Sequence, residues 1–278
     1  MSDKTRREFL KSCFQIGGYA AIASLGLGAV EDARGWGILP TIIGGGSPNW
    51  ATWNETDEGA IATDNIFVVL MENTSAGGNE TGQGGGLSEA DRTLTQTGSI
   101  AGAVGSPLTR QFDTNKWMTI TNNLANFICE STYTIIMKWN TISDVDGEGT
   151  MLRITEAYND TIITIGISPA RQPYINTDST STDKPANTPL TTGDVYIIAQ
   201  ADNSHNLMFG WNVTKPTRWS DVISAQKVDT GGLGDLSGET AGVGTHHIGT
   251  ALPSNNAALQ ITAKLQYIIL ANTTLLAY

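Results

Sequence analysis

Strict alternation of apolar and polar side chains near the C-terminus is the sequence feature that most constrains the fold. Between residues 259 and 269 the odd-numbered positions are Leu, Ile, Ala, Leu, Tyr and Ile, whereas the even-numbered ones are Gln, Thr, Lys, Gln and Ile. A period of two is that of a β-strand, whose successive side chains point to opposite faces of the sheet. The pattern therefore predicts a long strand with Leu265, Tyr267 and Ile269 on one buried face and Gln266 on the other.

A second alternating segment covers residues 133–139. Tyr133, Ile135, Met137 and Trp139 share one face, which predicts a half-buried strand with these four side chains in the core. The turn-forming sequence ADNSHN predicts a hairpin between the strands expected at 194–201 and 207–211. The other strands expected from the sequence lie at residues 65–71, 110–112, 117–121, 151–155 and 161–167.

The segments between these strands are predicted to be loops. Residues 77–87 contain six glycines, and they lack the lysine and the strand-then-helix context of a phosphate-binding loop. Residues 168–192 are rich in Thr, Ser, Asp and Pro, and residues 214–245 are also loop-like. No helical pattern occurs beyond the N-terminus, so we expect an all-β fold.

Composition agrees with a turn-rich β protein. Hydrophobic residues make up 40% of the 278-residue chain and charged residues 15%, and there are 31 glycines. The formal net charge of -11 disfavours nucleic acid as a partner, because an acidic surface repels phosphate groups. The chain has two cysteines, Cys13 and Cys129, and the first lies in the N-terminal apolar segment, so no disulfide framework is predicted.

The N-terminus resembles a twin-arginine export signal. Thr5, Arg6, Arg7, Phe9 and Leu10 precede eighteen uncharged residues, CFQIGGYAAIASLGLGAV. The sequence that follows, AVEDAR, departs from the small-x-small cleavage pattern, so the segment is either removed or retained as a hydrophobic helix that anchors the chain in a membrane through residues 9–30. We therefore divide the chain into a signal or anchor (1–33), a linker or arm (34–63) and a β-sandwich (64–278).

The arm is rich in Gly, Pro, Trp and Asn and shows no sustained period. Its tryptophans, Trp36, Trp50 and Trp53, either dock on the β domain or lie at a membrane interface. Docking is the commoner use, because an exposed Trp is unusual without a partner.

The order of motifs resembles the laminin-G-like, or concanavalin A-like, jelly roll, a two-sheet antiparallel sandwich. The motifs are a Gly-rich loop, the hairpin QFDTNKWMTI, the strand YTIIMKW, the segment TTGDVYIIAQADNSHNLMFGWN, a second Gly-rich loop and the final LQYIILANTTL. The resemblance covers about residues 65–276. It implies a lectin-like or glucanase-like domain in which calcium often binds at a loop rim.

Three acidic residues are candidates for chemistry on such a fold. Asp144, Asp146 and Glu148 have the spacing of catalytic carboxylates on one strand face, but Gly147 and Gly149 interrupt them, so we expect a loop. In a loop the same oxygens could ligate Ca²⁺, the one cofactor that we consider, although a solvated acidic turn is the simpler interpretation.

Sugar binding would use an exposed aromatic or imidazole ring near polar groups. The candidates are Trp219, Tyr158, Tyr174 and His205, all in or near expected loops. The adjacent pair His246 and His247 opens an expected strand. Because neighbouring strand residues point to opposite faces, the two imidazoles cannot share one metal without distortion, and a structural role is expected.

These observations predict a non-catalytic, exported or surface-displayed module that binds carbohydrate or a protein surface. One alternative is a structural coat, filament or virion-surface component in which residues 1–63 are retained, and a third interpretation is a glucanase-like glycoside hydrolase. A homo-oligomer is compatible with each of them.

Overall fold

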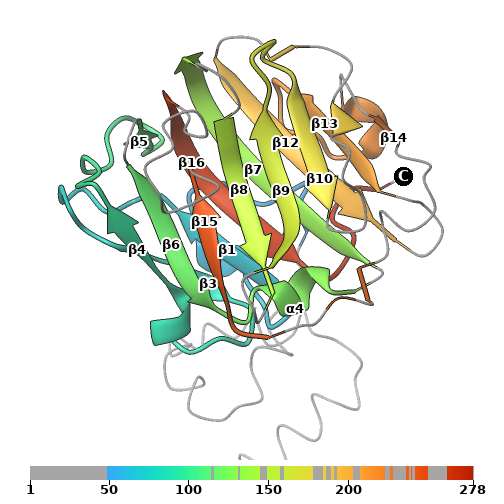
Figure 1. Ribbon diagram of the computed structural model, residues 1–278, viewed down its shortest axis with the longest axis horizontal. Helices are drawn as coiled ribbons and strands as arrows, with labels where there is room; N and C mark the ends of the chain where they lie inside the picture. Colours follow the sequence, from blue (N-terminus) through green and yellow to red (C-terminus); the bar gives the residue numbers. More distant parts are fainter. Residues whose placement is uncertain are drawn as a thin grey trace, which may run out of the picture. The chain divides into compact units, whose positions relative to one another are not determined.

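In the computed structural model the chain forms an all-β sandwich of two antiparallel sheets (Figure 1). The chain divides into two units, residues 1–47 and residues 48–278. The residues described belong to the second unit: 49–113, 116–130, 132–144, 149–156, 160–177, 184–185, 189–190, 193–202, 207–222, 226–227, 236–237, 239, 242–249 and 262–277. Trp36, Tyr158, His205, Asp146, Glu148 and the proposed export segment lie outside them.

The first sheet has the order β14-β13-β12-β7-β16-β1-β3, and β5 also pairs with β16. Its strands are β1 (Ile66–Leu70), β3 (Gln83–Gly84), β5 (Arg110–Phe112), β7 (Tyr133–Asp144), β12 (Asp194–Ala201), β13 (Met208–Asn212), β14 (Gln226–Lys227) and β16 (Thr262–Ala271). The predicted hairpin is confirmed, because β12 pairs with β13 from Tyr196 opposite Asn212 to Gln200 opposite Met208.

The second sheet has the order β11-β10-β9-β8-β15-β6-β4-β2. Its strands are β2 (Glu80–Thr81), β4 (Thr93–Thr97), β6 (Trp117–Asn122), β8 (Gly149–Thr155), β9 (Thr161–Ile167), β10 (Pro173–Thr177), β11 (Lys184–Pro185) and β15 (Gly244–Ile248). The short helices are η2 (Glu58–Ala60), η3 (Ala90–Arg92), α4 (Ala125–Ile128) and η4 (Trp219–Asp221).

Three loop predictions are corrected by these elements. Residues 77–87 contain β2 and β3, residues 168–192 contain β10 and β11, and residues 214–245 contain η4 and β14. In each case a strand pairs with a neighbour, β10 with β9 over five residues and β14 with β13, and this pairing satisfies backbone groups in a segment whose composition favours turns.

Strand β7 lies between β12 and β16, and both of its faces are buried. Tyr133, Ile135, Met137 and Trp139 pack in the core between the sheets, as predicted. The prediction of a half-buried strand is wrong, because Ile136 belongs to a second hydrophobic cluster on the outer face of the same sheet. The members of this outer cluster are Trp50, Trp53, Ile61, Ile66, Val68, Leu70, Ile136, Tyr196, Ile198, Val222, Tyr267, Ile269, Ala271 and Leu276.

Residues 49–62, which precede β1, supply several side chains of this outer cluster and cover the outer face of the first sheet. Trp50 and Trp53 are 1% and 6% exposed, and both rings contact the ring of Tyr267 edge-on, with centroids 6.5 and 5.3 Å away. Lys215 Nζ lies 4.4 Å from the centroid of the Trp50 ring and donates a hydrogen bond to the Trp53 carbonyl. Trp50 and Trp53 are therefore docked on the domain.

Candidate functional site

A β-bulge in β16 determines where the side chain of Gln266 lies. Leu265 pairs with Trp139 of β7, but Tyr267 pairs with Lys138, so Gln266 is an extra residue between two successive partners. A bulge of this kind breaks the alternation of side chains and redirects the strand beyond it. Leu265 accordingly packs between the sheets, whereas Tyr267 packs in the outer cluster, and the prediction that both share one face is wrong.

Gln266 is mostly buried, but its side-chain amide is not shut off from solvent. It is 4% exposed, and its backbone carbonyl accepts a hydrogen bond from the Met71 N–H at 2.9 Å. No hydrogen bond to the side-chain amide of Gln266 is found among the described residues. The amide nitrogen and oxygen remain accessible to solvent, so the fold does not use them as hydrogen-bonding groups.

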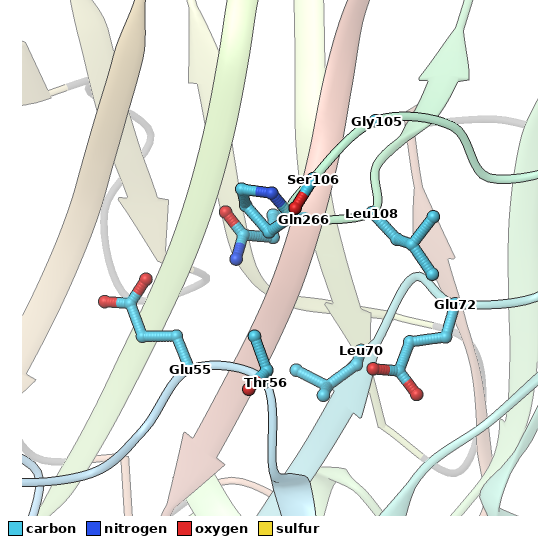
Figure 2. Close-up of a pocket in the computed structure, with 9 residues that line it drawn as sticks. Glu55, Thr56, Leu70, Glu72, Gly105, Ser106, Leu108 and Gln266 are labelled. Carbon is cyan, nitrogen blue, oxygen red and sulfur yellow. The ribbon is translucent and has the colours of Figure 1, made fainter.

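The Gln266 side chain lines an open hollow of about 210 Å³ on the outer side of the first sheet. The lining residues are Glu55, Thr56, Leu70, Glu72, Gly105, Ser106, Pro107, Leu108 and Gln266. Figure 2 shows Glu55 and Glu72 on opposite sides of this hollow, with Thr56 and Leu70 along one edge and Ser106, Leu108 and Gln266 along the other. Carboxylate, hydroxyl and amide groups thus surround a partly apolar surface.

One wall of the hollow is a tight loop of four residues, 105–108. It is closed by two hydrogen bonds of 3.0 Å between the backbone groups of Val104 and Thr109. Gly105 has a φ of +100°, a conformation that favours glycine because it has no Cβ. The loop therefore presents Ser106 and Leu108 on a short, closed frame.

A buried ion pair holds this loop beside Glu72. Arg110 Nη1 lies 3.0 Å from Glu80 Oε1, and the two side chains are 0% and 4% exposed. Arg110 also donates to the carbonyl groups of Gly78, Ile100 and Ala101, and Glu80 accepts from the backbone N–H groups of Glu72 and Asn73. Burial raises the pKa of Glu80, and hydrogen bonds from Asn73 and Arg110 oppose that shift. The pair ties together the two segments that lead into the hollow.

Glu55, on the opposite side, is held by two residues of the first sheet. Lys138 Nζ lies 2.7 Å from Glu55 Oε2, and the Tyr196 hydroxyl donates to Glu55 Oε1 at 3.0 Å. Burial lowers the pKa of Lys138, but hydrogen bonds to Glu55 and Tyr196 outweigh it, and the pKa is raised. Burial raises the pKa of Tyr196 to about 12, so its hydroxyl remains a donor at neutral pH. Both oxygens of Glu55 are therefore engaged.

Charges near the hollow do not cancel. Glu55 pairs with Lys138 and Glu80 with Arg110, whereas Glu58 and Glu72 have no basic partner among the described residues. Burial raises the pKa of Glu58, and the charges of Glu72 and Glu80 raise it further, against hydrogen bonds from Leu70 and Gln83 that lower it. Burial is the main cause of this rise, and the neighbouring carboxylates of Glu72 and Glu80 add to it.

The predicted sugar-binding residues do not come together in the described part of the chain. Trp219, in η4, packs half-buried against the outer cluster of the first sheet. Tyr174, in β10 of the second sheet, lies over Gly166, where a Cβ atom would come within 2.5 Å of its ring. Asp144 ends β7, and the remaining candidates lie outside the described residues, so the calcium site stays a prediction.

The two adjacent histidines are buried in β15. His246 Nδ1 accepts a hydrogen bond from the Thr155 N–H at 3.2 Å, and its Nε2 lies 3.2 Å from the Asn122 carbonyl. Burial lowers the pKa of His246 to about 4. These contacts agree with the structural role expected for His246. No group of three or more His, Cys, Asp or Glu that could hold a metal ion occurs among the described residues, and none of their helices is long and apolar enough to cross a membrane.

Sequence reasoning missed the hollow, since its residues come from four separate segments. Gln266 looks like an ordinary solvent-facing residue of an alternating strand. The one signal is that the polar positions of this strand stop at Gln266, because the next even-numbered position, Ile268, is apolar. Nothing in the sequence places Glu55 or Ser106 beside it.

Comparison with known proteins gives the fold. No protein-family model matches the chain, and no curated protein sequence matches it. The binding domain of Botulinum neurotoxin DC, solved in complex with rat synaptotagmin II, matches with a TM-score of 0.51 and 12% identity over 76% of this chain and 48% of that chain. At this identity the match shows a shared β-sandwich fold.

Two further solved structures are similar with lower TM-scores. A Trypanosoma rangeli sialidase in complex with the inhibitor DANA has a TM-score of 0.46 and 12% identity, over 75% of this chain and 30% of the sialidase. The Ruminococcus gnavus IT-sialidase CBM40 bound to alpha2,3 sialyllactose has a TM-score of 0.40 and 12% identity, over 54% of this chain and 80% of that domain. The chain thus spans about a third of the sialidase's length and about half of the toxin domain's.

Proposed function

We propose that this chain is a non-catalytic binding module, exported or displayed at a surface, that takes a saccharide unit into the hollow beside Gln266. The observation that carries the proposal is the solvent-accessible Gln266 amide, without a hydrogen-bond partner among the described residues, that the β16 bulge places in the wall of this hollow. An amide offers donors and acceptors together, which suits the hydroxyl groups of a sugar.

The rest of the hollow supports the same class of ligand. Glu72 and Ser106 supply further polar groups, and Leu70 and Leu108 supply apolar surface for the C–H face of a sugar ring. Sites for drug-sized molecules enclose about 300–1,000 Å³, so the smaller volume here favours a single ring or chain end.

The geometry favours binding over hydrolysis. Glycosidases use two carboxyl groups that are free to exchange a proton and to attack or activate water. At the hollow, both oxygens of Glu55 accept hydrogen bonds from Lys138 and Tyr196. Glu72 is then the remaining carboxylate among the lining residues.

A glycan array tests this function. The full-length protein is applied with Ca²⁺ and then with EDTA, beside a Gln266→Ala variant and a control, Gln111→Ala, which changes an exposed glutamine of β5. We expect saccharide binding in both conditions, retained by Gln111→Ala and weakened about tenfold or more by Gln266→Ala, because a ligand hydrogen bond is lost. Absence of binding in both conditions, or equal binding by Gln266→Ala, would contradict the proposal. Binding that EDTA removes would instead favour a calcium site.

A structural coat, filament or virion-surface component is the second candidate function. It requires an arm that is part of the folded body, and the burial of Trp50 and Trp53 meets this requirement for residues 49–62, although both residues would also remain after removal of residues 1–33. Mass spectrometry of the native protein separates the two. An intact N-terminus within an assembled particle favours the structural role, whereas a start after about residue 33 favours export.

A further inference from the structure

One carboxylate of the hollow, that of Glu72, has no charged partner among the described residues. It lies opposite Glu55, which Lys138 and Tyr196 bind. Glu72 is exposed, and its backbone N–H is bonded to Glu80, but no hydrogen bond or ion pair to its side-chain carboxylate is found among the described residues. Figure 2 shows Glu55 across the hollow from Glu72. Glu55 is already bonded to Lys138 and Tyr196. Of the two carboxylates that line the hollow, Glu72 is thus the one available to a ligand.

The residues around Glu72 leave the electrostatic potential of the hollow negative. The charge of Glu72 itself helps to raise the pKa of Glu58, and no basic residue is among those that line the hollow. Such an environment repels an anionic sugar and attracts a cation.

From this arrangement we propose that the hollow selects a saccharide that bears a protonated primary amine, with the amine bound to the Glu72 carboxylate and the neighbouring hydroxyls to Gln266 and Ser106. The inference rests on the proposed function and names the ligand class for the same site. An ammonium group offers three donors, which match a carboxylate and nearby amide or hydroxyl oxygens. A hydrogen bond to a charged group contributes more than a neutral one, so the amine should decide between related sugars.

Other cationic occupants fit less well. A divalent hard cation such as Ca²⁺ takes six to eight oxygen ligands, and one free carboxylate with an amide and a hydroxyl does not approach that number. A lysine side chain of a protein partner shares the amine but brings no ring hydroxyls to the Gln266 amide, which would then stay unbonded.

The test is calorimetric titration of the full chain at pH 6, where a primary amine is protonated. The probes are a β-1,4-linked glucosamine tetramer, its fully N-acetylated counterpart and tetralysine. Three variants accompany the unmodified protein: Glu72→Gln, which keeps the shape and removes the charge, Gln266→Ala, and the control Glu89→Gln, which changes an exposed carboxylate remote from the hollow lining.

We expect the unmodified protein and Glu89→Gln to bind the glucosamine tetramer about tenfold or more tightly than the N-acetylated one, since a charge-assisted hydrogen bond is at stake. Glu72→Gln should lose this preference and bind the two tetramers with equal affinity. Equal affinity of the unmodified protein for both tetramers, or a preference that survives in Glu72→Gln, would overturn the inference. Glu72-dependent binding of tetralysine without binding of the glucosamine tetramer would overturn it as well.

These outcomes distinguish a failure of the amine preference from a failure of the proposed saccharide binding. If the N-acetylated tetramer binds as well as the glucosamine tetramer, and Gln266→Ala weakens both, the hollow is a saccharide site without the amine preference. If no saccharide binds to the unmodified protein, the proposed function fails together with the inference.

Discussion

At the residue scale, two buried glutamines of the first sheet differ in a way that separates folding from function. Gln200 is 0% exposed, and its Oε1 accepts from Thr134 Oγ1 and from the N–H groups of Leu275 and Leu276, while its Nε2 donates to the Leu276 carbonyl. Gln266 is 4% exposed and has no such partners among the described residues. The first amide stabilises the fold, whereas the second is available to water or to a ligand.

The same substitution at the two positions should therefore have unequal effects. We expect Gln266→Met to change the free energy of unfolding by less than about 1 kcal/mol, because the amide that it removes makes no hydrogen bond to the described residues. Gln200→Met should lower it by about 2–4 kcal/mol, since several backbone and side-chain groups lose their partner. Urea unfolding monitored by tryptophan fluorescence measures both, and a loss of stability in Gln266→Met equal to that in Gln200→Met would refute the distinction.

His246 makes stability depend on pH. Its pKa falls from 6.5 to about 4 in the folded protein, so the unfolded state binds a proton more readily. Stability is therefore fully present above pH 6.5 and is lost as the pH falls towards 4, by about 3 kcal/mol. Protonation of Nδ1 would also break the hydrogen bond from Thr155. His247, whose pKa is lowered to about 4 by burial and by Arg153, acts in the same direction.

A His246→Gln variant tests this effect. We expect the slope of the unfolding free energy against pH, between 6.5 and 4, to decrease by up to about 1.4 kcal/mol per pH unit, which corresponds to one proton. Denaturant titrations at several pH values give the slope. An unchanged slope would show that His246 is not the group responsible.

At the scale of elements, the ion pair of Arg110 and Glu80 should matter for both stability and binding. Arg110→Met leaves the Glu80 carboxylate buried without its counter-charge, which typically costs about 3–5 kcal/mol. Because Glu80 positions the backbone at Glu72, saccharide binding should weaken as well. The double variant Arg110→Met, Glu80→Gln should recover part of the lost stability, and a double-mutant cycle measures the coupling. A cost below about 1 kcal/mol for Arg110→Met would contradict a structural role for the pair.

Strands with a regular alternation or a β-branched composition could be predicted from the sequence, but the bulge that interrupts the alternation in β16 could not. The expected strands at 161–167 and 194–201 match β9 and β12, because their alternation or β-branched composition persists along the whole strand. The bulge at Gln266 inserts one residue into β16. Apolar and polar residues still alternate in the sequence there, but the side chains no longer alternate between the two faces of the sheet. The functional hypothesis depends on that unpredicted bulge, as is common for bulges next to binding sites.

At the scale of the whole molecule, the sandwich and its inner core follow from the sequence, but its outer cover does not. The alternation in β7 predicts one buried face, which Tyr133 and Trp139 confirm. The second buried face arises from residues 49–62 and from segments around Val222 and Leu276, which pack over the first sheet from distant parts of the chain. No local pattern encodes such long-range packing, and the hollow lies where this cover meets the 105–108 loop.

Locating a bound sugar shows whether the hollow around Gln266 is the binding site. The measurement is an NMR titration of the labelled protein with the saccharide that binds most tightly on the array. We expect the side-chain amide signals of Gln266 and the backbone signals of Glu72 and Ser106 to shift, whereas the amide signals of the fully bonded Gln200 should not. Shifts confined to Trp219, Tyr174 or other residues away from the hollow would contradict it.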